Sequence, residues 1–489
     1  MQTVSNQIIK RMASTFRDNR ISIVLIQPYG LNPKIVLPLS LSYLKANLDE
    51  KICDVNIIDC ALRGLKSNSE EFKKLLQSYE PHIIGVSAWT QTYQEALDIL
   101  KISKIFFKNV ITVIGGSHAS ANYKEVVKNE QIDFLFRGES EFTFPLFINR
   151  ILNNIDFSNI SGLVYRRANG ELIINEPLVV NDIDKIKIPS YDSINLDEYI
   201  ESGYRYHTRE KYNAPILLTR GCPYTCQFCS VSLVNGKRVR KHGPGYVIRW
   251  IKYLYYEKGI RHINIIDDNF TFDVEYAKNI CKQIIQLNLK RLSFGTPNGI
   301  RMQRGDRELW GLMKKAGWKS IIVAPESGST HTLKLMRKNL KKEIVPNVVD
   351  DMKKMGLYVQ GYFIIGYPGE TKNDLLETRK LIMKTRFDLV SMFRFQPLPG
   401  TPVFDSLVEK SEISKDFLPN DYYSRKPNYE TYTLRKVNIP LFYIITYFLF
   451  FLQNPKRICF LVSKYDIYGI FKRIIDFNMR KNTVVMTKK

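Results

Sequence analysis

Short apolar runs that alternate with helical stretches limit this chain to a small set of folds. Between residues 21 and 145, five runs rich in β-branched residues are separated by stretches with helical character; they lie at 21–28, 55–60, 82–88, 110–116 and 133–139. Strands that alternate with helices form βαβ units, and such units build a parallel, doubly wound sheet. The pattern predicts an α/β, Rossmann-like domain over residues 21–150, with ligands bound at the carboxyl ends of its strands.

A second strand–helix series begins near residue 215. Its strand-to-loop transitions recur roughly every 30–40 residues, as in a barrel of β/α units; they lie at 215–230, 262–271, 292–299, 320–329, 359–371 and 390–401. In such barrels the chemistry sits on the loops that follow the strands. We therefore expect a (β/α) partial TIM barrel over residues 212–405.

The remaining segments differ from both series. Asn169-Gly170 is a dipeptide typical of a two-residue hairpin turn, so 151–211 is interpreted as a hairpin followed by a linker. Residues 1–20 are a short lead-in. Residues 406–489 form a tail that we expect to be mainly helical, rich in basic and aromatic residues.

Composition limits the compartment and the partners. The seven cysteines are unevenly spaced and the first 20 residues contain no apolar signal region, so the sequence favours a reducing cytoplasm. The net charge of +24 favours anionic partners such as phosphorylated substrates or an acidic membrane surface. Because no RNA-binding motif, helix-turn-helix or zinc-finger spacing is visible, no nucleic acid partner is expected.

Three cysteines form the chemical centre of the sequence. Cys222, Cys226 and Cys229 lie in one short loop after a predicted strand. Thiolates are the ligands of iron–sulfur clusters, and three protein ligands leave one iron open for another molecule. The alternatives are three unrelated buried cysteines or a zinc site, but zinc prefers four ligands and no second Cys/His pair stands nearby to complete the set.

The segment CPYTCQFC resembles the signature of the radical S-adenosylmethionine (SAM) superfamily, in which an aromatic residue, here Phe228, precedes the last cysteine. The resemblance implies a 4Fe–4S cluster whose open iron holds the amino and carboxylate groups of SAM. It also implies one-electron cleavage of SAM to methionine and a 5′-deoxyadenosyl radical that abstracts hydrogen from an unactivated carbon. An electron donor such as a ferredoxin or flavodoxin is then an expected partner.

Later motifs occur in the order that this family shows. Residues 324–329, APESGS, resemble the segment in which Glu326 and Ser327 contact SAM, and Gly361 to Gly366 resemble the glycine-containing strand beside the adenine. Residues 265–271, IIDDNFT, match a strand end of one subgroup. For each motif taken singly, ordinary strand-end packing is the alternative.

The first domain resembles the cobalamin-binding domain that precedes the barrel in the B12-dependent subgroup. Four segments carry the resemblance: residues 38–44, residues 83–90, residues 113–120 (VIGGSHAS) and residues 136–144. Ser87 lies in the second segment, and Gly115, Gly116 and His118 lie in the third. It implies that Ser87, Gly115, Gly116 and His118 border cobalamin, the two glycines by letting the backbone approach a large planar ligand.

One departure from that domain concerns cobalt. The Asp-x-His-x-x-Gly motif, whose histidine ligates cobalt, is absent from this sequence. His82 comes near it in spacing but is interpreted as a residue at a strand start. One expectation is that cobalamin binds without a protein histidine on cobalt. The other is that the domain keeps the fold but does not bind the cofactor.

Three classes of function follow from these resemblances. The first is cobalamin-dependent methylation of an unreactive carbon, with SAM regenerating the methyl donor. The second is radical carbon–carbon bond formation or cyclisation, known in the same subgroup for pigments and membrane lipids. A non-catalytic sensor is the third, but a sensor has no need of the SAM-like loops.

The tail bears on the substrate. Residues 439–452, IPLFYIITYFLFFL, are uncharged and too short to span a membrane, which takes about 20 apolar residues. From Thr431 onward there are 11 Lys and Arg residues against Asp466 and Asp476. The segment either caps the barrel or lies on the inner face of an anionic membrane. The second possibility favours a lipid-like substrate over another kind of small molecule. The other four cysteines, Cys53, Cys60, Cys281 and Cys459, are expected to be buried.

Overall fold

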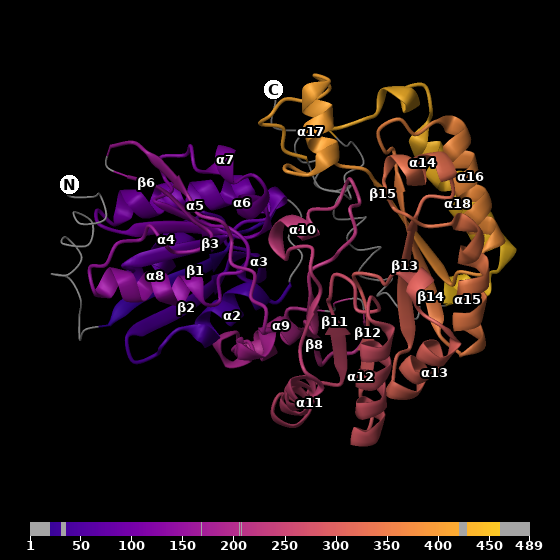
Figure 1. The fold of residues 1–489 in the computed structure, drawn as a ribbon, viewed down its shortest axis with the longest axis horizontal. Helices are drawn as coiled ribbons and strands as arrows, with labels where there is room; N and C mark the ends of the chain where they lie inside the picture. The colour runs from indigo at the N-terminus through magenta and orange to yellow at the C-terminus, as the bar shows by residue number, and fades with distance from the viewer. Residues whose placement is uncertain are drawn as a thin grey trace, which may run out of the picture.

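The computed structural model describes residues 20–30, 36–167, 169–204, 206, 208–419 and 428–459. An N-terminal domain and a second α/β domain lie side by side, and α18 (Ile439–Gln453) packs on the outer side of the second (Figure 1). The expected lead-in, except for Arg20, and residues 460–489 of the tail lie outside the described residues.

The N-terminal domain is built on a seven-stranded sheet with the order β2-β1-β3-β4-β5-β6-β7. Its first five strands are parallel: β1 (Ile21–Gln27), β2 (Cys53–Asp59), β3 (Ile83–Ser87), β4 (Ile111–Gly115) and β5 (Phe134–Phe136). The strand order reverses between β1 and β3, so the sheet is doubly wound as predicted.

Helices cover both faces of this sheet because alternate residues of its strands point to opposite sides. Ile23 and Leu25 of β1 pack in one core with α2 (Leu39–Asn47) and α8 (Thr143–Leu152). Val24 and Ile26 pack in the other core with α4 (Glu70–Ser78) and α5 (Tyr93–Phe106). Strands buried on both faces explain why the sequence shows continuous apolar runs here rather than alternation.

The predicted hairpin extends the same sheet. β6 (Leu163–Arg166) and β7 (Leu172–Ile174) are antiparallel, and β6 also pairs antiparallel with β5. Arg166 faces Leu172 across the turn that holds Asn169 and Gly170. The hairpin therefore covers the edge of β5 that the parallel strands leave open.

The second domain has six parallel strands in the order β8-β11-β12-β13-β14-β15. They are β8 (Asn213–Ile216), β11 (His262–Ile265), β12 (Ser293–Gly295), β13 (Ser320–Glu326), β14 (Tyr358–Ile365) and β15 (Leu389–Arg394). Single bridges, Phe294 to Trp318 and Ile300 to Val323, join the two three-stranded halves. Within the described residues β15 does not pair with β8, so the barrel is partial, as predicted.

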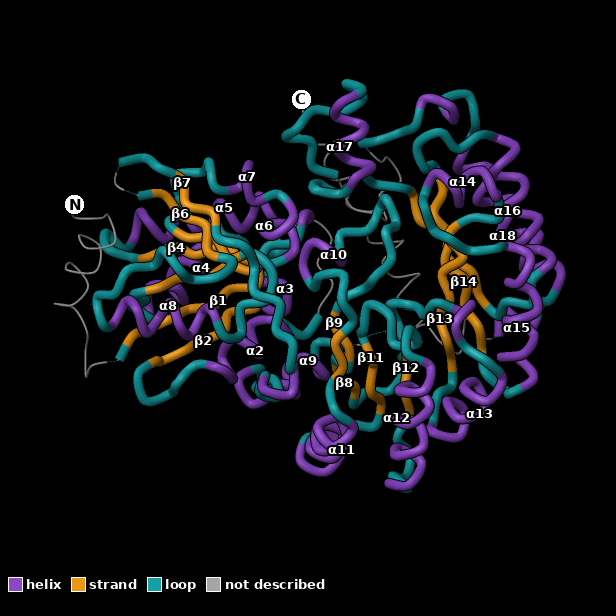
Figure 2. Tube along the Cα trace, viewed as in Figure 1, coloured by secondary structure: helices purple, strands orange, loops and turns teal. Residues whose placement is uncertain are grey.

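Helices flank the outside of this barrel (Figure 1). They are α11 (Pro244–Lys252), α12 (Val274–Leu287), α13 (Arg307–Ala316), α15 (Val345–Lys354) and α16 (Lys372–Lys384). Trp250 of α11 and Trp310 of α13 are fully buried in its core, with Trp318 just before β13. Figure 2 shows the strands of the two domains as two groups with connecting loops between them.

The described part of the tail packs on the barrel through one face of α18. Phe442, Thr446 and Phe450 are buried, and Arg379 of α16 donates to the Thr446 hydroxyl at 3.0 Å. The guanidinium of Arg457 lies 3.9 Å from the centre of the Phe450 ring. No described helix is long and apolar enough to cross a membrane.

Two phenylalanines of α18 provide a matched test of this packing. Phe450→Ala should lower the free energy of unfolding by about 3–5 kcal/mol, because it leaves a cavity against the barrel. Phe448→Ala should change it by no more than about 0.5 kcal/mol, because that side chain is 64% exposed. Thermal unfolding followed by circular dichroism measures both. Equal losses in the two variants would contradict the described orientation of α18.

Candidate functional site

The three cysteines lie together in the loop that follows β9 (Thr219–Arg220). All are half-buried, and the backbone N–H of Cys229 donates to the Cys226 carbonyl at 3.2 Å. Burial raises the pKa of the Cys229 thiol to about 12, with smaller contributions in the same direction from Cys226 and Cys222. The three thiols are therefore close enough to influence one another electrostatically. In the described segments, however, no three His, Cys, Asp or Glu side chains are close enough together to hold a metal ion.

Backbone hydrogen bonds hold the cysteine loop between two elements of the barrel. The N–H of Gln227 donates to the Met336 carbonyl at 2.9 Å, and the N–H of Val403 donates to the Gln227 carbonyl at 3.1 Å. The Phe228 ring packs edge-on against Tyr367, with centroids 6.4 Å apart. The aromatic residue before the last cysteine thus anchors the loop on the barrel.

The other cysteines divide by exposure. Cys53, Cys60 and Cys281 are buried as expected. The prediction that Cys459 is buried is wrong, because its side chain is exposed just beyond α18. The apolar run before it had suggested burial, but only one face of that run packs on the barrel.

The two predicted residues at the end of β13 have different surroundings. Glu326 has a positive φ of 67° and accepts a hydrogen bond from the Lys338 ammonium at 2.8 Å. The Ser327 hydroxyl is fully buried and lies 3.1 Å from the Thr378 hydroxyl. An added Cβ on Gly328 would meet the Glu377 carbonyl oxygen at 2.6 Å, so glycine allows this loop to pack against α16.

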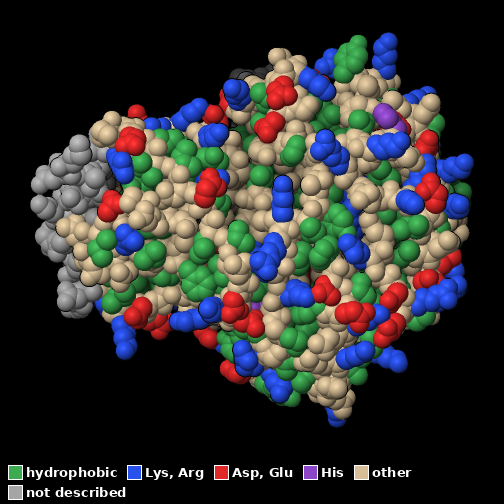
Figure 3. Space-filling view, in the orientation of Figure 1, with side chains coloured by type: hydrophobic (Ala, Val, Ile, Leu, Met, Phe, Trp, Pro, Cys, Tyr) green, Lys and Arg blue, Asp and Glu red, His purple; other side chains and the backbone are tan. Residues whose placement is uncertain are grey.

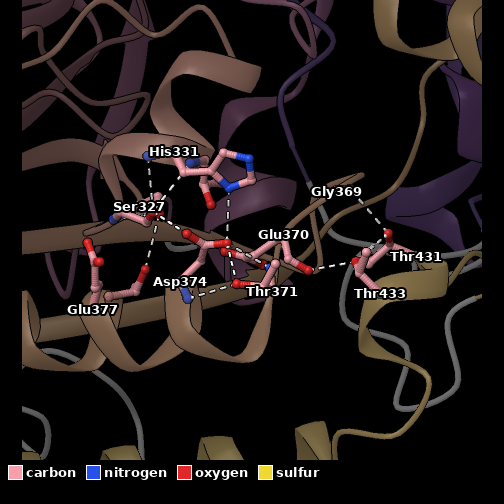
Figure 4. A network of polar contacts seen from close by, with 12 residues as sticks. Ser327, His331, Gly369, Glu370, Thr371, Asp374, Glu377, Thr431 and Thr433 are labelled. Carbon is pink, nitrogen blue, oxygen red and sulfur yellow. Dashed lines mark hydrogen bonds and ion pairs between the residues drawn. The ribbon is translucent and has the colours of Figure 1, made fainter.

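A polar network joins the loops after β13 and β14 (Figure 4). The Asp374 carboxylate accepts from the Thr371 backbone N–H at 2.8 Å and caps α16. The same carboxylate bonds to the Ser329 hydroxyl and lies 3.1 Å from Nδ1 of His331. One carboxylate therefore fixes the relative position of the two loops that carry the predicted SAM contacts.

The network extends into the tail. The buried Glu370 carboxylate accepts from the Gly366 N–H at 2.6 Å, and burial raises the pKa of Glu370 to about 8. The Thr433 hydroxyl donates to the Glu370 carbonyl at 2.6 Å, and the Gly369 N–H donates to the Thr431 hydroxyl at 3.3 Å. Residues 431–433 thus hold the loop that begins at Gly366, a role that no motif in the sequence indicated.

Gly361 and the DDNF segment occupy the expected places on the barrel. Gly361 is buried within β14 beside the Phe387 ring. Asp267 follows β11, where burial raises its pKa to about 7 and the Thr219 hydroxyl donates to it at 2.8 Å. Asn269 and Thr296, which follow β11 and β12, are buried with side-chain polar atoms that have no hydrogen-bond partner among the described residues. Asn269 belongs to the segment 265–271 that the sequence singled out, whereas no motif in the sequence indicated Thr296.

A cavity of about 360 Å³ lies between the domains, at the carboxyl ends of the first sheet. Ser87, Gly115 and Gly116, which the sequence assigned to cobalamin, all line it. The second domain contributes residues from around the cysteine loop and the end of β11: Leu217, Arg220, Val234, Asn235, Ile266 and Asp268. The wall is mostly apolar, and its glycines allow close approach of a flat ligand, which suits a corrin ring.

His118 lies apart from this cavity. Its side chain is 1% exposed, its ring centre is 4.2 Å from that of Tyr93, and its Nδ1 is 3.2 Å from the Thr90 hydroxyl. Burial lowers the pKa of His118 to about 4. The structure brings Ser87, Gly115 and Gly116 together at the cavity but does not bring His118 there.

A buried ion cluster joins the domains at the cavity wall. Arg220 Nη1 lies 2.7 Å from Glu141 Oε1 and 3.2 Å from Glu139 Oε1. Arg240 Nη1 lies 2.5 Å from Glu139 Oε2. The acids follow β5, whereas the arginines lie on β9 and β10 (Arg240–Lys241), and all four side chains are at most 9% exposed. No motif in the sequence indicated this cluster as part of the site.

Two family models match the chain in separate regions. The B12 binding domain matches residues 33–148, and the radical SAM superfamily matches residues 216–382. The first region holds β2 to β5 of the doubly wound sheet, and the second holds most of the barrel. The matches confirm the predicted architecture and the expected set of cofactors, which are a 4Fe–4S cluster, SAM and cobalamin.

Curated relatives span most of the chain. An uncharacterised methyltransferase of Pyrococcus horikoshii is 32% identical over 371 residues, which cover 75% of this chain and 78% of the relative. Cytidylyl-2-hydroxyethylphosphonate methyltransferase of Streptomyces wedmorensis is 24% identical and covers 78% of this chain and 80% of its own. The anaerobic magnesium-protoporphyrin IX monomethyl ester cyclase of Rubrivivax gelatinosus is 25% identical, with 76% and 65% covered.

One solved structure has the same fold over most of its length. The radical SAM methyltransferase TsrM of Kitasatospora setae, with cobalamin and a 4Fe–4S cluster bound, superposes with a TM-score of 0.67 at 19% sequence identity. The alignment covers 83% of this chain and 82% of TsrM.

The cysteine triad can be tested directly. Changing Cys222, Cys226 and Cys229 together to Ala should abolish the broad visible absorbance of a 4Fe–4S cluster and all cleavage of SAM, because the loop then carries no thiolate to bind iron. Cys459→Ser is the matched control, since that exposed cysteine lies outside the loop. Anaerobic reconstitution followed by absorbance and iron analysis measures the outcome. Full cluster content in the triple variant would overturn the assignment.

The cavity can be tested at Gly115. An added Cβ there would have its nearest contact at 3.9 Å, so Gly115→Val should fold normally while filling the cavity. Cobalamin should bind on the order of tenfold more weakly, as expected for excess bulk in a fitted pocket. Exposed Gly245 on α11, changed to Ala, is the control. Gly116 is unsuitable for this test, because its φ is 95° and an added Cβ would lie 2.6 Å from the Ala88 carbonyl oxygen. Unchanged cobalamin content in Gly115→Val would contradict the cavity assignment.

Proposed function

We propose that this chain, which belongs to the radical SAM enzymes with a B12-binding domain, methylates an unactivated carbon of a lipid-like small molecule. The observation that carries the proposal is a cavity whose wall is shared by the two domains. Asp268 lines that cavity, and it also accepts a hydrogen bond from the N–H of Gly221, the residue before Cys222, at 3.2 Å. A corrin in the cavity would therefore lie beside the loop that holds the cluster.

Bound cobalamin supplies a transferable methyl group that SAM replenishes, and the bound cluster supplies the electron that cleaves a further SAM molecule. The chain's own residues position these reactants. The apolar walls of the cavity exclude water, and Asn235 donates to Asp268 at 2.8 Å, which keeps that carboxylate directed at the cysteine loop. No histidine is among the residues lining the cavity, so we propose that cobalamin binds there without an imidazole ligand.

Polar contacts to SAM and substrate are proposed for the barrel side. Buried polar groups are normally hydrogen-bonded, so the unpartnered amide of Asn269 and hydroxyl of Thr296 suit a bound ligand. Both follow strands at the carboxyl end of the barrel, where β/α barrels place their chemistry. We assign to them, together with Glu326, the contacts that orient SAM or the substrate.

The lipid-like substrate class rests on the apolar and basic tail. An electron donor such as a ferredoxin or flavodoxin is a proposed partner, because SAM cleavage consumes an electron. The proposed location is the cytoplasm, at the inner face of the membrane.

Methyl transfer is tested by labelling. Reconstituted enzyme, reductant, hydroxocobalamin and SAM with a deuterated methyl group are incubated anaerobically with a lipid extract and, separately, with an aqueous extract. Mass spectrometry should find a lipid-fraction product that carries the deuterated methyl group, together with S-adenosylhomocysteine and 5′-deoxyadenosine. A labelled product found only in the aqueous fraction would overturn the lipid-like substrate and leave methyl transfer standing.

The cyclase relative favours a second candidate, radical bond formation or cyclisation on the same scaffold. Cyclisation predicts 5′-deoxyadenosine and a modified product without the deuterated methyl group or S-adenosylhomocysteine. The same experiment therefore decides between the two candidates.

A further inference from the structure

The outward face of α18 exposes a continuous apolar stripe. Leu441 is 48% exposed, Ile444 64%, Phe448 64% and Leu452 63%. Successive members are three or four residues apart, so they lie along one side of the helix. The opposite side is fixed on the barrel, which means that this stripe is presented outward by a rigid element.

Exposed cations lie at both ends of α18 and on the helix packed beside it. α18 itself contains no charged residue, but exposed Arg435 and Lys436 precede it and exposed Lys456 follows it. The neighbouring α16 adds exposed Lys380 and Lys384. Figure 3 shows Lys and Arg side chains, with Asp and Glu side chains among them, along the edge where α15 and α16 lie in Figure 1.

We propose that α18 docks the enzyme on the surface of a membrane rich in anionic phospholipids. The apolar stripe would enter the boundary between headgroups and acyl chains, and the surrounding cations would meet the lipid phosphates. The helix lies in the plane of the surface, because its inward face remains packed on the barrel.

Charge complementarity selects the membrane over a second copy of the chain. A symmetric dimer through α18 would bring the same basic surroundings face to face, and like charges across an interface oppose association. An anionic lipid surface instead complements the stripe and its border together.

Docking at α18 also places the membrane next to the reaction loops. The segment 431–433, which lies shortly before α18 in the chain, is bonded to the loop at Gly369 and Glu370. The Tyr447 hydroxyl of α18 accepts from the Met392 N–H of β15 at 3.2 Å. The docking face therefore belongs to the same rigid unit as the proposed SAM-binding loops, although its existence does not depend on methyl transfer.

The test uses full-length holoenzyme and sedimentation with sucrose-loaded vesicles. Vesicles of phosphatidylglycerol and phosphatidylcholine should bind the enzyme, and vesicles of phosphatidylcholine alone should bind it at least about tenfold more weakly. Binding should fall as salt rises, since the screening length shrinks from about 10 Å at 0.1 M to about 3 Å at 1 M.

Variants separate the stripe from general basicity. The double variant Ile444→Glu, Phe448→Glu should lose at least about tenfold in vesicle affinity, while SAM cleavage in detergent solution stays unchanged. Ile105→Glu on α5 is the matched control, because Ile105 is 69% exposed on the other domain; it should bind as the parent does.

Two outcomes would overturn the proposal. One is equal recovery of the parent and the double variant with anionic vesicles. The other is a dimer of the parent, seen by light scattering without lipid, that the double variant abolishes; this would assign the stripe to a second copy. Because SAM cleavage is measured in the same samples, failure of docking is distinguished from failure of the enzyme.

Discussion

The ion cluster of Arg220, Arg240, Glu139 and Glu141 is the interaction on which the rest of the site depends. Burying four charges is unfavourable unless each finds its partner, and removal of one partner from such a pair typically costs about 3–5 kcal/mol. This requirement makes the arrangement of the two domains specific: acids that follow the first sheet must meet arginines of the second domain. The wall of the cavity includes Glu139, Glu141 and Arg220, so the cavity forms only when these acids and arginines are paired.

The two domains bring their reactive edges together in a similar way. In each, parallel strands deliver their loops to one edge, and in Figure 2 the loops lie between the two groups of strands. The cysteine loop is held by backbone hydrogen bonds of Gln227, and the loops proposed to bind SAM are held by Asp374 and by the tail threonines. Rigid strands therefore set the position of each loop, and polar side chains set its conformation.

Sequence alone predicted both sheets, because their strands are buried on both faces and appear as β-branched runs. It also predicted the cysteine loop and three cavity residues, since these features are local in the chain. The ion cluster was beyond reach: Glu139 is 81 residues from Arg220 and 101 from Arg240, so only the folded chain pairs them. The surroundings of His118 and Cys459 were also not predictable from the sequence, because a local sequence pattern does not tell which way a side chain faces.

A cavity with walls from two domains has a thermodynamic consequence. A ligand that contacts both walls binds only the docked arrangement, so its binding free energy adds to the stability of the interface between the domains. An isolated first domain lacks Leu217, Arg220 and Asp268, and with them part of the wall. Corrinoid affinity and domain docking are thus one coupled equilibrium in this protein: the factor by which docking strengthens corrinoid binding is also the factor by which a bound corrinoid strengthens docking.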